Sequence, residues 1–345
     1  MVQNEIAIKI LTDRGSCRWD NYVRTHESGT FFHLAGWMEI LGRVFGHKTF
    51  YLYAQTGTEI VGVLPLGNIK SFLFGNSLSS VPFCVYGGVL SNTPEIGDLL
   101  ETEARKIAND LSVDSLELKN TRKNENELPT KELYVTFKKK IDPDPDVNMK
   151  NIPRKQRAMV RKGIKAGMDP VWDNNLNVFY NTYALSVKSH GTPVFPKKYF
   201  MALLKVFKSD CKILNVYKDN IPVSTVMVFY FRNEALPYYG GGTPEARRLK
   251  AFDYMYWEVM QDACRQGLGI FDYGRSKKGT GSYSFKKNWG FEPQQLYYQY
   301  YLVKAEKIPE INPLNPKYRL FIAAWKKLPL FVTKMIGPLL SRNLG

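Results

Sequence analysis

The chain has 345 residues, 44% of them hydrophobic and 14% aromatic, and at this length two domains are expected rather than one core. Its 48 Lys and Arg residues against 32 Asp and Glu residues give a formal net charge of +16. This excess favours anionic partners, namely phosphate groups, nucleic acid or an acidic membrane surface. Charge alone does not choose among them, because solubility with weak non-specific binding explains the excess equally well.

The thiol and imidazole side chains disfavour a disulfide framework and a metal site. The four cysteines lie far apart without a Cys-x-x-Cys, and the four histidines lack the spacing of metal ligands. We therefore expect reduced thiols and no metal. The N-terminus has no basic-then-apolar leader pattern, and no uncharged apolar run is long enough to span a bilayer. A cytoplasmic protein is expected, with a peripheral position on the inner membrane as the alternative.

Residues 1–145 alternate between helix and strand patterns. The spacing of apolar residues predicts helices at 19–25, 34–45 and 95–111 and strands at 6–11, 49–54, 60–66, 115–119 and 133–138. Residues 55–58 are the predicted turn of a hairpin, whereas residues 75–88 fit neither pattern. The run Asp142-Pro143-Asp144-Pro145-Asp146 then indicates a domain boundary, because two prolines in a polar run interrupt regular structure.

The pattern restarts after this boundary. Helices are predicted at 153–166, 176–189, 196–207, 246–266 and within 283–291, and strands at 212–217, 223–231, 235–239, around 271 and at 296–303. Both halves thus place helices, a strand pair, a glycine-bearing stretch, a long helix and two further strands in the same order. We predict an α/β protein with domains at 1–145 and 146–305, followed by a helical tail at 306–345.

The tail carries an apolar stripe at helical spacing. The stripe comprises Leu320, Phe321, Ala324, Trp325, Leu328, Phe331, Val332, Met335, Ile336, Leu339 and Leu340. Basic residues lie off this stripe or at its end, and Pro329 and Pro338 must kink or end helices. Two interpretations stay open: the tail packs on the protein body, or residues 317–341 form an interfacial helix that contacts an anionic membrane.

The segment from Tyr238 to Phe291 is the expected active site. It reads as strand, glycine loop, helix, strand, polar turn and short basic helix. A glycine loop before a helix can set backbone N–H groups against a phosphate or carbonyl oxygen. The sequence motifs of P-loop NTPases, α/β-hydrolases and classical dinucleotide enzymes are absent, and no cysteine stands beside a plausible histidine. Positioning and proton transfer are therefore favoured over covalent catalysis.

This order of elements is also the layout of the GNAT acyltransferase core. Together with residues 154–167, Tyr238-Tyr239-Gly240-Gly241 and residues 285–291, it resembles the FemAB/FemX family, tandem GNAT-like domains that add amino acids to peptidoglycan precursors. Over roughly residues 5–305 the chain is similar to a FemAB-related branch found with exopolysaccharide and PEP-CTERM exosortase systems, where residues 33–37, 74–88 and 271–276 recur. The resemblance implies two GNAT-like domains in tandem, with mixed central sheets flanked by helices.

One departure bears on the acyl donor. The usual GNAT pyrophosphate loop, Arg/Gln-x-x-Gly-x-Gly/Ala, is replaced by residues 244–251, which disfavours ordinary binding of acetyl-CoA. FemAB members resemble this chain there and use aminoacyl-tRNA. We therefore expect no permanently bound cofactor and either acyl-CoA or aminoacyl-tRNA as the donor substrate, with tRNA as a candidate partner.

The resemblance also proposes the catalytic residues. It implies that Lys286 reaches an anionic acceptor or stabilises a developing oxyanion, although a solvated lysine on a basic helix is the alternative and Lys287 is adjacent. Asp272, at an expected strand end beside Arg275, has the chemistry to take a proton from an attacking amine. The competing interpretation is an ion pair between Asp272 and Arg275 that orders the turn, with Arg275 otherwise a substrate-binding residue.

The basic helix near residue 153 supplies a candidate phosphate site. Arg157 and Arg161 share one face of it, with Arg154 close by. Like charges so placed repel unless an anion bridges them, and arginine binds phosphate through two parallel hydrogen bonds. A merely solvated basic face explains the pattern almost as well.

Three aromatic residues complete the candidate substrate contacts. Tyr239 alternates with Tyr238, so only one of the two points into the site, where a phenol can bond substrate or simply pack. Trp37 and Tyr86 are candidates for a wall contributed by the first domain. The spacing around Trp37 favours core packing, whereas Tyr86, before two glycines, is expected to be exposed.

We therefore expect an N-acyltransferase that transfers an acyl or aminoacyl group to an amine of a peptidoglycan or exopolysaccharide precursor. The basic charge fits an acceptor linked to a nucleotide diphosphate or a lipid diphosphate. Two other hypotheses remain open. One is a non-catalytic, membrane-peripheral scaffold in exopolysaccharide assembly, and the other is an acyl-CoA-dependent N-acetyltransferase.

Overall fold

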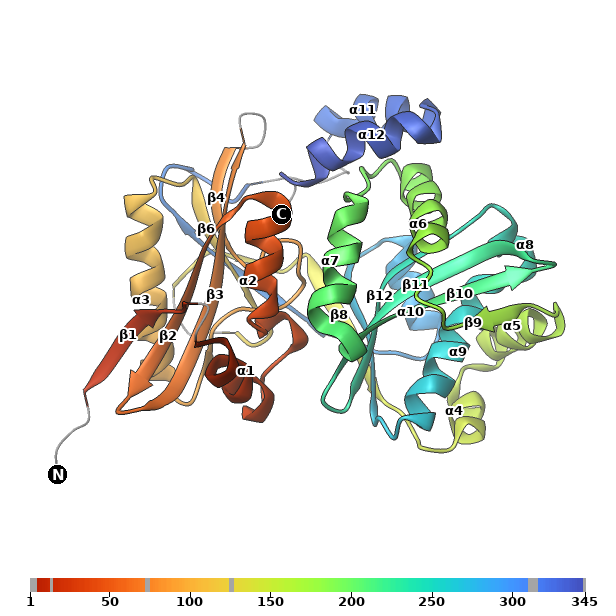
Figure 1. Ribbon diagram of the computed structural model, residues 1–345, viewed down its shortest axis with the longest axis horizontal. Coiled ribbons are helices and arrows are strands. Elements are labelled where there is room, and N and C mark those ends of the chain that lie inside the picture. The colour runs from red at the N-terminus through yellow and green to blue at the C-terminus, as the bar shows by residue number, and fades with distance from the viewer. Residues whose placement is uncertain (1–4, 13–14, 72–74, 124–126, 310–315, 344–345) are drawn as a thin grey trace. The chain divides into compact units, whose positions relative to one another are not determined.

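The computed structural model describes residues 5–12, 15–71, 75–123, 127–309 and 316–343. The chain folds into two compact units (Figure 1). The first unit comprises Met1–Leu133, Gln295–Glu310 and Arg342–Gly345, and the second comprises Tyr134–Gln294 and Ile311–Ser341. Each unit is built on one mixed sheet with helices against it, so the predicted α/β fold class is confirmed.

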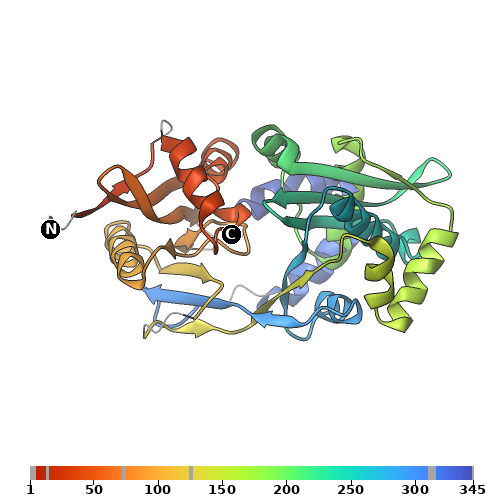
Figure 2. The same cartoon turned by 90° about the horizontal axis from the view of Figure 1, so that it is seen from below.

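The sheet of the first unit has the order β1-β2-β3-β4-β6-β15-β7, with β5 paired to β3. Neighbouring strands pair antiparallel except β4 and β6, which run parallel and are joined through helix α3. Figure 2 shows β15 (blue) between β6 and β7. The strands are β1 (Ile6–Ile10), β2 (Lys48–Thr56), β3 (Glu59–Ser71), β4 (Gly75–Ser80), β5 (Leu90–Ser91), β6 (Ser115–Asn120), β7 (Thr130–Lys131) and β15 (Tyr297–Leu302).

Helix α3 forms the apolar core of this unit together with the sheet. It starts where Thr93 accepts a hydrogen bond from the backbone N–H of Ile96 and Pro94 occupies the first turn, both preferred at helix starts. Leu100 and Ala104 on its inner face are fully buried among residues of the sheet. The helices of this unit are α1 (Ser16–Thr25), α2 (Gly36–Ile40) and α3 (Pro94–Asp110), and α2 continues into a π-helical turn at Leu41–Phe45.

The second sheet has the order β14-β8-β13-β12-β11-β10-β9, in which β12 and β13 pair in parallel. Helix α9 joins these two strands, as α3 joins β4 and β6 in the first unit. The strands are β8 (Tyr134–Lys140), β9 (Asp169–Val171), β10 (Cys211–Lys218), β11 (Ile221–Phe231), β12 (Glu234–Gly242), β13 (Ile270–Lys277) and β14 (Pro293–Gln295).

Helices cover both faces of this second sheet. A Cβ on Gly240 or Gly242 would meet side chains of α9, whereas a Cβ on Gly241 would meet α6, so α9 and α6 lie on opposite faces. Helix α5 packs on α9, and α11 and α12 pack on α6. The helices are α4 (Pro145–Asn151), α5 (Arg154–Lys165), α6 (Leu176–His190), α7 (Lys197–Phe207), α8 (Glu245–Leu249), α9 (Ala251–Arg265), α10 (Gly281–Asn288), α11 (Pro316–Lys327) and α12 (Leu330–Ser341).

The two units exchange their last strands relative to the expected boundaries. Strand β8, predicted as the end of a domain at 1–145, pairs with β13 in the second sheet. Strand β15, predicted as the end of a domain at 146–305, pairs with β6 and β7 in the first sheet. Chain order cannot reveal this, because strand pairing joins residues that are far apart in sequence. The Asp-Pro run does not separate the units either, since Asp144 caps α4 and Pro145 opens it.

Four local predictions differ from the structure. Residues 75–80, which fit no pattern, form strand β4. The helix expected at 246–266 is broken at Lys250, which has a φ of 58° and separates α8 from α9. The predicted glycine loop at Gly240–Gly242 is the end of strand β12, and β13 continues to Lys277 instead of ending at Asp272. Phe74, part of one quoted motif, lies outside the described residues.

Candidate active site

The two parallel strands of the second sheet part soon after they meet. β12 and β13 pair only at Glu234 with Ile270 and Ala235 with Phe271 within the described residues. Each strand also carries a β-bulge beyond that point. Tyr238 is the extra residue of β12 opposite β11, and β13 places Tyr273 and Gly274 opposite a single residue of β8. Bulges redirect side chains and end regular pairing, so this region exposes backbone groups that an intact sheet would use.

The bulge in β13 binds the amine of Lys286. Helix α10 begins at the cap residue Thr280, whose hydroxyl accepts the N–H of Tyr283, and it carries Lys286 back over the bulge. The Lys286 Nζ donates to the carbonyl oxygens of Gly274 at 2.9 Å and Arg275 at 3.0 Å. An ammonium has three donors, so one remains for a substrate oxygen. Lys287, by contrast, is exposed.

Burial strongly perturbs this lysine. Its side chain is 9% exposed, and desolvation lowers the pKa of Lys286 from 10.5 to about 7. The carboxylate of Asp272 raises this pKa and the guanidinium of Arg275 lowers it further, so both charged groups lie near the amine. The structure therefore brings Lys286, Asp272 and Arg275 together around one bulge.

Asp272 is part of the bulge rather than of an exposed turn. Its carboxylate is 1% exposed and accepts the N–H of Gly274 at 2.7 Å and the hydroxyl of Thr136 at 3.4 Å. Gly274 has a φ of 65°, a conformation that glycine adopts at no steric cost, which allows the chain to fold back onto the carboxylate. The guanidinium of Arg275 lies 4.4 Å from the ring centroid of Tyr134, which orients it.

Helix α9 fills the opening between β12 and β13 with a residue that the sequence patterns did not single out. The ring of Tyr256 packs edge-on against Tyr273 at 5.0 Å, and its hydroxyl lies 2.9 Å from the position that a Cβ on Gly240 would occupy. Burial raises the pKa of Tyr256 to about 12, so its hydroxyl stays protonated and can donate. The signal was present as a tyrosine on the apolar face of a helix, a position that core packing also explains.

Tyr239 points into an aromatic core. Its side chain is 7% exposed, its hydroxyl lies 2.8 Å from that of Tyr199, and its ring contacts Tyr183, Phe195 and Phe200. This is the packing role that the sequence left open for it.

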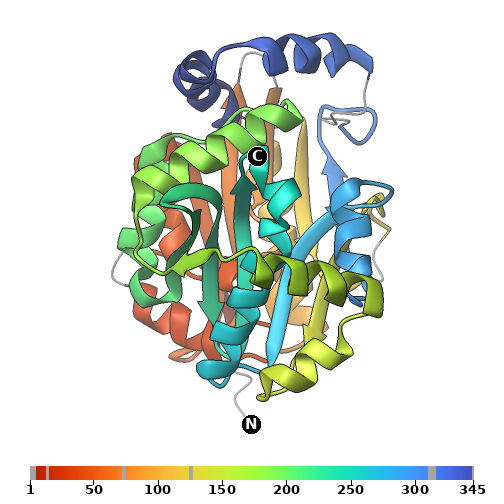
Figure 3. The same ribbon diagram turned by 90° about the vertical axis from the view of Figure 1, so that its right-hand side faces the viewer.

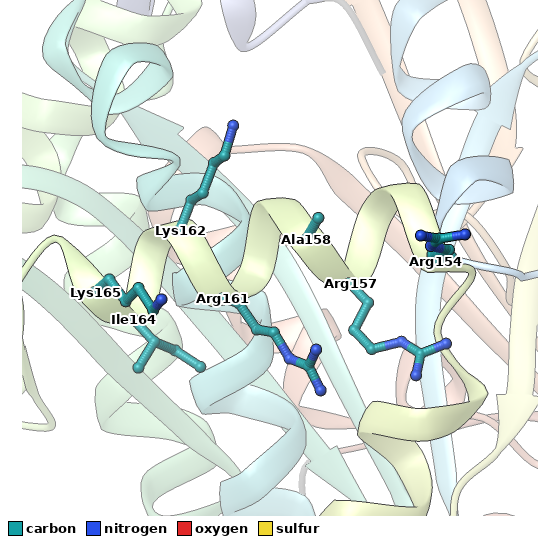
Figure 4. Close-up of a pocket in the computed structure, with 7 residues that line it drawn as sticks. All are labelled: Arg154, Arg157, Ala158, Arg161, Lys162, Ile164 and Lys165. Carbon is teal, nitrogen blue, oxygen red and sulfur yellow. The ribbon is translucent and has the colours of Figure 1, made fainter.

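The three predicted arginines line one side of α5. Arg154, Arg157 and Arg161 border an open pocket of about 560 Å³ whose lining comes from α5 alone. Figure 4 shows Arg157 and Arg161 extending from the same side of the helix, and Arg157 also donates to the carbonyl of Ile152. The opposite face is buried, where Gln156 bonds Asp253 of α9.

This helix begins beside the catalytic candidates. A Cβ on Gly290, just after α10, would lie 3.0 Å from the ring of Pro153, the residue that precedes α5. Burial raises the pKa of Asp253 to about 6, although Gln156 opposes that shift. The contacts at Gly290 and Asp253 fix α5 against α9 and α10.

The two candidates from the first unit are buried. Trp37 is fully buried, and its indole N–H donates to the carbonyl of Phe31 at 3.1 Å. Tyr86 is 4% exposed and packs edge-on against Phe32 at 5.6 Å, so the expectation of an exposed Tyr86 was wrong. The two glycines after Tyr86 suggested a surface loop, but Phe32, distant in sequence, covers the ring.

The family motifs around His33 and Gly88 meet in this unit. His33 Nε2 lies 3.1 Å from the carbonyl of Gly88, and burial lowers the pKa of His33 to about 4, which keeps the imidazole neutral. They border an open pocket of about 510 Å³ together with Lys119 and Asn120. Lys119 bonds the carbonyl of Val81 and Asn120 bonds Gln299, so these polar groups serve the fold.

The described residues contain neither a metal-ligand cluster nor a disulfide. No group of three or more His, Cys, Asp or Glu side chains among them is arranged to hold a metal ion. All four cysteines are free thiols, and Cys17 is the exposed one.

One family model matches the part of the chain that contains the candidate site. Residues 148–287 match the family model described as "Acetyltransferase (GNAT) domain", a span that includes α5, β12, β13 and most of α10. No curated protein sequence is significantly similar to the chain.

Solved structures agree on the fold of the whole chain. FemX is similar with a TM-score of 0.66 at 15% identity, covering 92% of this chain and 100% of that one. The C-terminal domain of a putative lysylphosphatidylglycerol synthetase from Agrobacterium fabrum is similar with a TM-score of 0.56 at 11% identity, covering 83% and 91%. A tandem GNAT protein from the clavulanic acid biosynthesis pathway is similar with a TM-score of 0.54 at 12% identity, covering 88% and 100%.

These findings confirm the FemX-like tandem GNAT fold that the sequence motifs suggested. GNAT domains take acyl-CoA as donor, and the diverging strands β12 and β13 lie inside the matched span. The second unit thus carries an acyltransferase domain of the GNAT type at residues 148–287, and the chain as a whole has the tandem fold of FemX.

Proposed function

We propose that this protein transfers an acyl or aminoacyl group to an amine of a cell-envelope precursor, and that the bulge of β13 is its catalytic centre. The observation that carries the proposal is the buried Lys286, bound to two bulge carbonyls beside Asp272 in a GNAT domain. Lysine is rarely buried unless it is paired, and strongly perturbed pKa values cluster at functional sites, so Lys286 is a candidate catalytic group.

The chemistry assigns a separate role to each group. The nitrogen of the acceptor amine attacks the carbonyl carbon of the donor, a C–N bond forms, and the thioester C–S or ester C–O bond breaks. Asp272 takes the proton that the amine loses, and this proton finally reaches the leaving thiol or hydroxyl. The third N–H of protonated Lys286 stabilises the oxyanion that develops on the carbonyl. The protonated hydroxyl of Tyr256, beside Gly240, is a further candidate donor to the substrate.

The basic surface of α5 supports an anionic substrate. Arg154, Arg157 and Arg161 form an open basic surface at the start of a helix that packs beside α10. Acyl-CoA, aminoacyl-tRNA and precursors linked to a nucleotide or lipid diphosphate all carry phosphates that suit such a surface. The names of FemX and the putative lysylphosphatidylglycerol synthetase direct the proposal toward envelope acceptors.

Alanine variants of the adjacent Lys286 and Lys287 test the proposed catalytic centre. Lys286→Ala is expected to lower kcat by about a hundredfold or more, the usual loss of an oxyanion donor. Lys287→Ala, which removes an exposed lysine of the same helix, is expected to stay within about twofold because such a side chain makes little contribution. Thermal unfolding of both variants shows whether the fold is kept. Equal activities of folded Lys286→Ala and Lys287→Ala would remove Lys286 from the mechanism.

The acyl donor can be identified by experiments that do not depend on the proposed catalytic centre. Intact-mass analysis of ligands retained on the purified protein, followed by calorimetry with CoA thioesters and with aminoacyl-tRNA, separates the two classes. Binding of a CoA thioester without binding of aminoacyl-tRNA selects an acyl-CoA-dependent N-acetyltransferase, and the reverse selects an aminoacyl transferase.

A further inference from the structure

Helices α11 and α12 lie on the outside of the second unit, where each contacts α6 (Figure 3). Their inner face is packed: Trp325 and Thr333 are each 2% exposed, and Gly337 approaches the backbone of Val194 so closely that a Cβ would lie 3.0 Å from its nitrogen. The Ser341 hydroxyl donates to the carbonyl of Val194 at 3.1 Å. The α11–α12 segment is therefore packed on this unit, which is one of the two interpretations of the tail that the sequence left open.

The α11–α12 segment exposes several large apolar side chains. Leu320, Phe321, Phe331, Met335 and Leu339 are between 43% and 83% exposed. They make up five of the eleven exposed large hydrophobic residues in the described part of the chain. Phe331, Met335 and Leu339 are four residues apart, so they form one continuous ridge along α12. A concentration of exposed apolar area on one short segment indicates an interaction surface.

The charge of this segment is of one sign. Residues 311–345 contain six Lys and Arg residues and no Asp or Glu. Lys326 and Lys327, at the end of α11, are exposed. A surface with an apolar ridge and only positive charges is complementary to a partner that offers acyl chains and negative head groups.

We propose that the α11–α12 segment docks the protein onto an anionic membrane surface, with its apolar ridge among the acyl chains and its lysines at the head groups. No helix among the described residues has the length and apolar character needed to cross a bilayer. Helices α11 and α12 have 12 residues each, so both are expected to lie in the plane of the membrane surface. This docking is independent of the proposed acyl transfer.

A second copy of the chain fits this face less well. A two-fold contact through the ridge would bring Lys326 and Lys327 of both copies to one surface where the segment supplies no acidic residue to pair with them. Like charges brought together in this way oppose association, whereas a phosphatidylglycerol surface attracts the same lysines.

Vesicle flotation of the full chain tests the proposal. The wild-type protein is expected to float with vesicles of phosphatidylcholine mixed with phosphatidylglycerol and far less with phosphatidylcholine alone. F331S/M335S/L339S should lower partitioning into the mixed vesicles by at least about tenfold, because three ridge side chains lose their burial. The matched control M201S/I221S removes two equally exposed apolar residues elsewhere in the same unit and should change it by less than about twofold.

The charge contribution is measured separately. K326Q/K327Q should reduce binding to the mixed vesicles by about twenty-five-fold, since each lysine near an anionic surface contributes about fivefold. K205Q/K208Q, at two exposed lysines of another helix end, should have little effect. The proposal is overturned if the ridge variant floats as well as the wild type. It is also overturned if the wild type does not float and light scattering shows a dimer that the ridge variant converts to a monomer.

Discussion

Lys286 shows how strongly its surroundings perturb one buried side chain. Two carbonyls of the β13 bulge bind its amine, and desolvation brings its pKa to about 7. Near neutral pH both protonation states are populated, so small changes around the amine decide its charge. The exposed neighbour Lys287 shares the helix and the residue type but has none of these contacts in the described structure.

This lysine makes the stability of the fold depend on pH. Between about pH 7 and 10.5 the unfolded chain holds a proton on this amine that the folded chain has released. The free energy of unfolding of the wild type, compared with Lys286→Met, should therefore rise with pH across this range. We expect a relative gain on the order of 2 kcal/mol between about pH 7 and pH 9 from denaturant unfolding. A difference between wild type and variant that is flat with pH would contradict the lowered pKa.

At this scale the sequence named Lys286, Asp272 and Arg275, which the structure brings together around one bulge, but it could not assign their environments. The residue pattern left Lys286 and Lys287 equivalent, although the family resemblance favoured Lys286, and the burial of Lys286 separates the two in the structure. It placed Asp272 at a strand end, whereas the strand continues through a bulge that Gly274 makes possible. It expected Tyr86 at the surface, where Phe32 in fact covers it.

The end of β12 shows why an element needs three consecutive glycines. The chain packs against helices on both faces here, with Gly240 and Gly242 toward α9 and Gly241 toward α6. Each missing Cβ leaves space that a helix side chain or backbone occupies. The sequence correctly marked these glycines as a special backbone position, but their role is close helix packing within a strand rather than a phosphate loop.

A methyl group at Gly240 should disturb both packing and catalysis. Gly240→Ala places its Cβ 2.9 Å from the hydroxyl of Tyr256, which must shift. We expect a loss of about 1–3 kcal/mol in unfolding free energy from denaturant titration, with reduced kcat. Gly281→Ala is the matched control, because no atom lies within 4 Å of its Cβ, and it should be neutral or slightly stabilising. If Gly240→Ala and Gly281→Ala have the same free energy of unfolding, the close approach at Gly240 does not contribute to stability.

At the scale of the whole molecule, the first unit depends on a strand from beyond its N-terminal segment, and the second unit begins one strand earlier than the expected boundary. The first sheet needs β15, which follows the second unit in sequence, and the second sheet takes β8, which precedes α4. A fragment cut at the expected boundary therefore carries the wrong strand and exposes the edges of β6 and β7.

Two fragments test this arrangement. Residues 1–145 alone should aggregate or unfold non-cooperatively in circular dichroism, because β15 is missing. Lys131 pairs with Tyr298 in antiparallel register, so Leu133 and Gln295 end close together. Residues 1–133 joined to 295–309 by a short Gly–Ser linker should therefore form a hairpin there and melt cooperatively. A cooperative melt of 1–145 alone would show that β15 is dispensable.

The sequence by itself determined the features that depend on neighbouring residues. Apolar periodicity located most helices and strands, and the order of motifs indicated a tandem GNAT fold with chemistry in the second half. Tertiary structure alone decided which strand completes each sheet, which lysine is buried, and where the two bulges open the sheet. The physical reason is that strand pairing and desolvation arise between residues far apart in the chain, and local patterns carry no record of them.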